Sequence, residues 1–91
     1  MSTFIQDFLI AEPFGMAAIK DTYKRSFRDW KHDYKMLTDL VIAVNYLCWH
    51  YYEIGNADLS ELYSELYYKC RDYALDHLKG EEFQYFWEMT D

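Results

Sequence analysis

Hydrophobic residues recur along this chain at intervals of three and four, the spacing that places them on one face of an α-helix. The longest such run puts on one side of a helix Leu59, Leu62, Tyr63, Leu66, Tyr67, Cys70, Tyr73, Ala74 and Leu78. Asp58 and Glu61 stand in the positions of a capping pair at its start, and Gly80 follows it as a stop. The pattern therefore predicts a long helix over residues 58–79.

The same periodicity predicts further helices before and after this one. They are expected over Ser2–Ala11, from Pro13 to about His32, over Tyr34–Ile54 and over 81–89. Pro13 suits the first position of a helix, and Gly55 suits the left-handed residue that closes many helices. Three glycines and one proline leave too few turns for a β-sandwich or a barrel. We expect a single all-α domain over residues 1–91, a small helical bundle of three main helices with a short helix at each end.

The predicted helix over 34–54 is apolar on nearly every side. One face carries Leu37, Leu40, Val41, Val44, Leu47, Cys48 and Tyr51, and the back carries Ile42, Tyr46 and Trp49. A helix of this kind is covered on both sides, so either the terminal helices cover its back or another subunit does. Tyr68 and Leu75 form an apolar pair on the charged side of the next helix. These residues, Ile42, Tyr46, Trp49, Tyr68 and Leu75, are the candidate interface.

Charge is unevenly distributed in a chain whose net charge is −7. Residues 20–35 hold six Lys or Arg and three Asp, whereas the remainder holds three Lys or Arg and thirteen Asp or Glu. The candidate basic stripe consists of Lys20, Lys24, Arg28, Lys31 and Lys35. Cations beside aromatic rings can bind single-stranded nucleic acid, but the acidic remainder would repel a polyanion. We expect pairing with the acidic helix of the same chain or of a second copy, and no nucleic acid partner.

The segment NYLCWHYYEIGN brings together residue types that bind metals and catalyse reactions. On a helix, however, Cys48 and His50 point about 200° apart and cannot share an ion. We expect His50 to make a surface or interface hydrogen bond, Asn45 to be a buried amide, and His77 to be a satisfied core residue. No catalytic, cofactor or metal site is predicted. The alternative is a small helical metal-binding protein or enzyme that uses His50, His77 and nearby carboxylates.

The expected location of the protein and the state of its cysteines follow from the absence of membrane-span, signal-peptide and zinc-site patterns. No run approaches the roughly 18 apolar residues of a membrane span, and the N-terminal segment has no basic region of the secretory type. We therefore expect a cytoplasmic protein without membrane contact. Cys48 and Cys70 lie on separate predicted helices without zinc-ligand spacing, so we expect both to be reduced core residues.

The second half of the chain resembles a family of small uncharacterised helical proteins from phages and mobile elements of gut bacteria. The matching features are a helix from LTDLV to Asn45, the Trp49 and Tyr52 pair, the LY and LYY helix, and the terminal KGEE followed by aromatic residues and TD. The resemblance implies an accessory protein without a catalytic residue. We expect a non-enzymatic protein that binds a protein partner, such as a host protein, and that forms a homo-oligomer with a dimer favoured.

Overall fold

The structure is a computed structural model that describes residues 3–90, and it is all-α over that range. Its elements are α1 (Thr3–Ala11), the 3₁₀-helix η1 (Glu12–Phe14), α2 (Met16–Trp30), α3 (Tyr34–Glu53), α4 (Ala57–His77) and α5 (Glu81–Thr90). Three long helices with a shorter one at each end agree with the prediction. The predicted start of the first helix, Ser2, lies outside the described residues.

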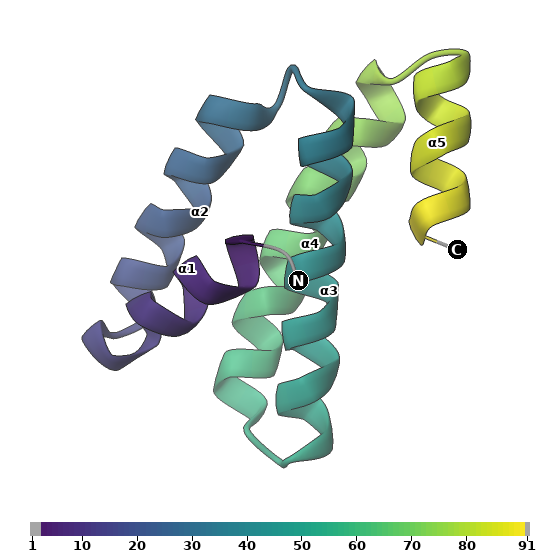
Figure 1. Ribbon diagram of the computed structural model, residues 1–91. Coiled ribbons are helices and arrows are strands. Elements are labelled where there is room, and N and C mark those ends of the chain that lie inside the picture. Colours follow the sequence, from purple (N-terminus) through teal and green to yellow (C-terminus); the bar gives the residue numbers. More distant parts are fainter. Residues whose placement is uncertain (1–2, 91) are drawn as a thin grey trace.

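Helices α3 and α4 form an antiparallel hairpin around which the others are arranged (Figure 1). Helices α1 and α2 pack on one side of the hairpin, and α5 runs beside α3 on the other side (Figure 1). Helix α3 is the element in contact with each of the other four α-helices. It is therefore the central helix, which is one of the two arrangements that its apolar surface suggested.

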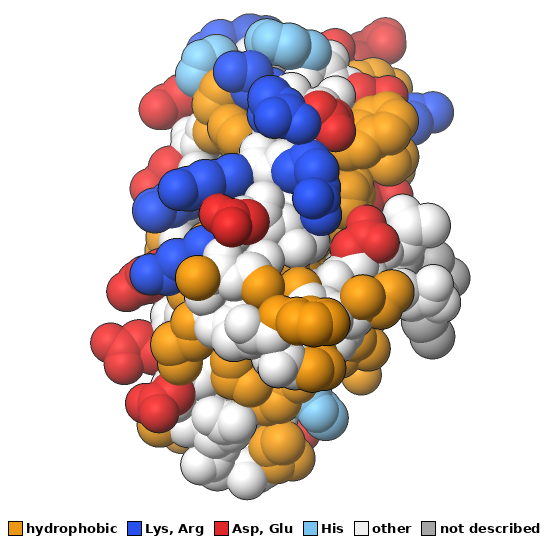
Figure 2. Space-filling model, turned by 90° about the vertical axis from the view of Figure 1, so that its left-hand side faces the viewer, with side chains coloured by type: hydrophobic (Ala, Val, Ile, Leu, Met, Phe, Trp, Pro, Cys, Tyr) orange, Lys and Arg blue, Asp and Glu red, His pale blue; other side chains and the backbone are white. Residues whose placement is uncertain are grey.

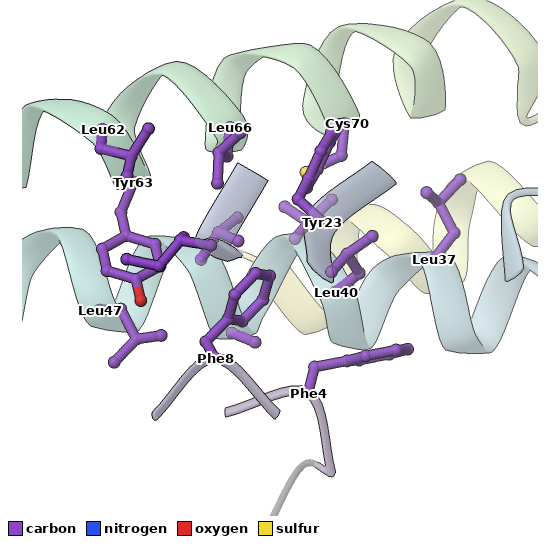
Figure 3. Close-up of a cluster of buried hydrophobic side chains, with 14 of the residues drawn as sticks. Phe4, Phe8, Tyr23, Leu37, Leu40, Leu47, Leu62, Tyr63, Leu66 and Cys70 are labelled. Atoms are coloured by element: carbon purple, nitrogen blue, oxygen red, sulfur yellow. The ribbon is translucent and has the colours of Figure 1, made fainter. Parts of the chain in front are cut away.

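The core lies between α1, α2 and the inner faces of α3 and α4. Figure 3 shows side chains from these helices converging, with Phe4 and Phe8 of α1 directed toward the hairpin. Phe8 meets the Tyr63 ring edge-on, with ring centroids 5.6 Å apart at 87°. Thr38 is fully buried, and its hydroxyl donates to the Tyr34 carbonyl at 2.7 Å. This hydrogen bond within α3 thus compensates for the burial of the Thr38 hydroxyl.

Glu12 ties the connection between α1 and α2 to both helices of the hairpin. One carboxylate oxygen accepts a hydrogen bond from the Tyr51 hydroxyl of α3, and the other accepts from the Tyr63 hydroxyl of α4 at 2.7 Å. The two rings stack with centroids 5.9 Å apart at 6°. Burial first, and then the bond to Glu12, raise the pKa of Tyr51 to about 12 and the pKa of Tyr63 well above its usual value.

The second helix begins at Met16 rather than at the predicted Pro13, and it ends at Trp30 rather than near His32. Pro13 lies in η1, and Gly15 adopts φ +101° between η1 and α2. A positive φ breaks the helical path, so the chain turns at this glycine while Glu12 remains bound to the hairpin.

The start of α4 also differs from the prediction. Its cap is Asn56, whose side chain accepts from the Leu59 N–H at 3.2 Å, whereas the expected cap Asp58 lies inside the first turn. The preceding Gly55 has φ +82° and closes α3, as predicted. Because Gly55 turns the chain tightly, the next residue is already in position to cap the following helix.

Replacing Glu12 by Ala is expected to lower the free energy of unfolding by about 2 kcal/mol, because two tyrosine hydroxyls lose a charged acceptor. Glu65→Ala is the matched control, since Glu65 is exposed on α4 and should change stability by less than about 0.5 kcal/mol. Urea unfolding followed by circular dichroism measures both. Equal losses for the two variants would contradict a stabilising role for Glu12.

Stability should fall as the pH rises above about 10, the pKa of tyrosine in an unfolded chain. Tyr51 ionises only near pH 12 in the folded protein, so its contribution is complete below pH 10 and is lost between these values. We expect Tyr51→Phe to make the loss of unfolding free energy with pH shallower. The control is Tyr46→Phe, at an exposed ring, which should keep the wild-type slope. Urea titrations at several pH values between 9 and 12 would refute this if both variants matched the wild type.

A candidate binding groove between α3 and α4

A groove of about 770 Å³ lies between α3 and α4, beside the turn that joins them. Helix α3 contributes Asn45, Cys48, Trp49 and Tyr52, and α4 contributes Ser60, Glu61, Ser64, Tyr67 and Tyr68, with Gly55 and Ala57 at the turn. We refer to it as the α3–α4 groove. Three other hollows, of about 460, 340 and 200 Å³, are smaller.

Short side chains along the seam between the two helices create this groove. Ser60 donates its hydroxyl hydrogen to the Cys48 carbonyl at 3.0 Å, which holds the helices close together near the turn. Ser60 and Ser64 are four residues apart, so they lie in a row along α4, and both are too small to fill the space above the seam. The space therefore remains open, flanked by the large rings of neighbouring positions.

Aromatic rings surround the groove and are largely exposed. Trp49, Tyr52 and Tyr68 are 57%, 68% and 54% exposed. Trp49 and Tyr52 meet edge-on, with ring centroids 5.7 Å apart. Large rings that share one hollow and remain about half exposed to water are typical of contact surfaces, because a partner that covers them removes apolar area from water.

The structure brings together part of the predicted interface. Trp49 and Tyr68 both line the α3–α4 groove, and Tyr46 is 56% exposed on the back of α3. Ile42 and Leu75 are half-buried. The prediction thus identified exposed rings on both helices, although its two aliphatic members are partly covered.

Helix α5 covers only part of the back of α3. At the start of α3, the Tyr34 ring meets Tyr85 of α5 edge-on at 5.3 Å. Toward the other end, Tyr46 and Trp49 remain exposed. The sequence suggested that either a terminal helix or another subunit covers this face. The terminal helix α5 covers it along the first half of α3, and the second half is exposed.

His77, but not His50, occupies a different environment from the one expected. His77 is exposed rather than in the core, because α4 ends there and the next residue, Leu78, is the buried one. Its ring stacks on Tyr73, and its Nδ1 lies 2.9 Å from the Tyr73 carbonyl. His50 is also exposed, and its ring stacks on Tyr46 with centroids 6.2 Å apart.

Other polar candidates for chemistry lie apart from one another. Within residues 3–90, no three His, Cys, Asp or Glu side chains are placed so that they could hold a metal ion. Both cysteines are free, as predicted. Cys70 is buried, and burial raises the pKa of its thiol to about 12, whereas Cys48 is only half-buried in the groove rather than in the core. Asn45 is half-buried, and its amide makes no hydrogen bond to another described residue.

The basic stripe lies on the surface without the expected partners. Figure 2 shows Lys and Arg side chains gathered on this face of the molecule. Arg28 pairs with its neighbour Asp29 at 3.1 Å, and Lys31 and Lys35 lie 5.9 Å from the centroids of nearby rings. The other ion pair among residues 3–90 joins Arg71 and Asp72 of α4. The expected pairing of the stripe with the acidic side of α4 is therefore not formed within the molecule.

Sequence reasoning missed two contributions to the exposed apolar surface. Tyr52 was not assigned to either face of its helix, although it is the most exposed ring of the groove. Ile10 and Phe14, 69% and 79% exposed, line a second hollow beside η1. Neither α1 nor η1 is long enough for its periodicity to indicate which side is covered.

Comparisons of the sequence with protein families and curated proteins, and of the structure with solved structures, gave no match. The resemblance to phage and mobile-element proteins therefore stays a prediction. No helix between residues 3 and 90 has the length and the apolar composition to cross a bilayer.

Thiol reactivity provides a direct check of this geometry. Ellman's reagent at neutral pH should react rapidly with one thiol, Cys48 in the groove, and with Cys70 only after the protein unfolds. Cys48→Ser should remove the rapid phase, and Cys70→Ser should leave it unchanged. Rapid reaction of both thiols in the native protein would show that the hairpin does not protect Cys70 as described.

Proposed function

We propose that this protein is a non-enzymatic binding protein that accommodates a segment of a protein partner in the α3–α4 groove. The supporting observation is the set of three rings, Trp49, Tyr52 and Tyr68, each more than half exposed around one hollow. Covering their exposed parts removes roughly 300 Å² from water, worth about 7 kcal/mol before the cost of association. This gain is sufficient to anchor a partner.

The openness of the groove favours a protein partner over a small molecule. A site for a small ligand encloses most of the ligand surface, whereas these rings stand in solvent on a broad seam between two helices. Tyr and Trp are enriched at protein interfaces because they combine a large apolar area with a polar tip. The free amide of Asn45 supplies both a donor and an acceptor within the same hollow.

The alternative, a metal-binding protein or an enzyme that uses His50 and His77, has less support. Ser60 lies beside Cys48, so His50 is close to the start of α4. His77 lies about 25 Å farther along that helix, at a rise of about 1.5 Å per residue. Two histidines that far apart do not share a site.

Several expectations from the sequence are retained as proposals. They are a homo-oligomer with a dimer favoured, a host protein as partner of a phage or mobile-element protein, a cytoplasmic location and packing of the helices as a bundle. The exposed Tyr46 and Trp49 supply a surface on which association of either kind would bury apolar area.

Site-specific photo-crosslinking tests the proposal. A benzophenone amino acid at position 52 should crosslink one discrete protein in the native host, and the same probe at Asp76, which is exposed on α4 outside the groove, should not. The crosslinked protein is then purified and its affinity measured. We expect Trp49→Ser combined with Tyr68→Ser to weaken binding at least tenfold, because two anchoring rings are removed.

Trp87→Ser is the matched control for this experiment. Trp87 is 53% exposed, close to the 57% of Trp49, but it lies on α5 outside the groove. It should leave the affinity unchanged. Loss of affinity in the control, or full affinity in the groove variant with its circular dichroism intact, would overturn the proposal.

A further inference from the structure

Carboxylates without cationic partners flank one end of the α3–α4 groove. Glu61 lines the groove itself, and the exposed Glu53, Asp58 and Glu65 are each next in sequence to a residue of the groove lining, near the ends of α3 and α4 that meet at the turn. The groove lining contains neither Lys nor Arg. The ion pairs among residues 3–90 involve none of these four carboxylates. We call this set, Glu53, Asp58, Glu61 and Glu65, the acidic rim.

Three cations near the acidic rim, Lys20, Lys69 and Arg71, form no ion pair with it. Lys20 of α2 shares a shallow hollow with Asp58, Glu61 and Glu65 on the other side of α4, but it pairs with none of them. Lys69 and Arg71 lie within one turn beyond Tyr68, and the Arg71 guanidinium pairs with Asp72 at 3.8 Å. An occupant of the groove therefore meets rings in the middle and negative charge beside the turn.

The form of the groove fits a helix. Its α4 wall extends from Ala57 to Tyr68, about 16 Å at the rise of an α-helix, which is the length of three turns of a bound helix. Ala57, Ser60 and Ser64 make a row of small side chains into which a ridge of another helix can pack. A β-strand could not pair here, because residues 3–90 contain no sheet edge to which it could be added.

From these observations we infer that the occupant of the α3–α4 groove is an amphipathic helix of a partner protein, with Lys and Arg beside its apolar face. The inference rests on the proposed function and specifies its partner. The apolar face covers Trp49, Tyr52 and Tyr68, and the cations lie against the acidic rim. Charges of opposite sign on the two surfaces steer the encounter and fix its direction.

A second copy of this chain does not meet that description. Its helix rich in Lys and Arg is α2, whose apolar residues Ile19 and Tyr23 are 0% and 6% exposed in the core. Its exposed apolar helix α5 presents Phe83 and Trp87 beside glutamates, at positions 81, 82 and 88. Docking α5 in the groove would place carboxylates against carboxylates, which is unfavourable.

Selection from a peptide library tests the inference. The library displays helical 16-residue peptides with fixed apolar positions at helical spacing and with Lys, Glu, Gln or Ser at the flanking positions. It also contains an unstructured proline-rich set. Peptides are selected on the wild-type protein and depleted on the Trp49→Ser variant, which folds because the ring it loses is exposed. We expect the enriched peptides to be helical and to carry Lys beside the apolar face.

Two measurements on an enriched peptide then show how much its affinity depends on charge. Affinity should fall about tenfold between 50 and 300 mM NaCl, since opposite charges are screened. Glu61→Lys should weaken binding about tenfold, whereas Glu82→Lys, the same change on α5 outside the groove, should leave it unchanged. Enrichment of helices with neutral or acidic flanks, equal effects of the two Lys variants, or enrichment of the proline-rich set would overturn the inference.

The remaining outcomes separate the inference from the proposed function. A dimer in sedimentation equilibrium that Trp49→Ser dissociates would show a second copy in the groove, which overturns the basic-helix inference and leaves a protein-binding groove. Absence of any peptide preference for the wild type over Trp49→Ser overturns the inference. If the position-52 crosslinking also fails, the proposed function falls with it.

Discussion

A helix that is apolar on nearly every side requires neighbours on nearly every side, and this constraint organises the whole molecule. Helix α3 is covered by α4 along its length and by α1 and α2 on its inner face. Within residues 3–90, its back is covered by the ten residues of α5. Ten helical residues extend about 15 Å, half the length of α3, so the second half of the back is left bare. The exposure of Tyr46 and Trp49 on the back of α3 is a direct result of this shortage.

The inner side of the hairpin is organised by one carboxylate. Glu12 accepts hydrogen bonds from two tyrosines that lie 39 and 51 residues farther along the chain. A single side chain therefore fixes the path of α1 and η1 relative to both long helices. The same contact explains why Phe8 reaches Tyr63 and why Gly15 must turn the chain sharply. The two sides of the hairpin thus differ in kind. One is closed by aromatic packing and hydrogen bonds, and the other leaves large rings exposed.

The long helices were predictable from the sequence because many apolar residues in each segment share the helical spacing. The central position of α3, the hairpin with α4 and the closure at Gly55 follow from patterns that extend over twenty residues. Boundaries were less predictable. Pro13 suits a helix start in general, but here the contacts of Glu12 and the positive φ of Gly15 decide otherwise.

The groove itself was predictable only in part. Trp49 and Tyr68 could be identified as exposed apolar residues on separate helices, but their proximity depends on how the two helices are rotated in the hairpin. The Ser60 hydrogen bond that sets this spacing is a contact between residues twelve apart, which no local pattern encodes. The sequence analysis wrongly placed His77 in the core for a similar reason. Helix α4 ends at His77, and the next residue, Leu78, is the one that is buried.

The attachment of α5 has a consequence for motion. Phe86 is its one buried residue in the described part of the chain, and the contact between Tyr85 and Tyr34 adds a half-buried ring. Detaching α5 therefore exposes far less apolar area than separating α3 from α4, and partial unfolding begins with the element that is released most easily. In deuterated solvent, the backbone amides of α5 should exchange well before those of the hairpin, while the rest of the protein remains folded.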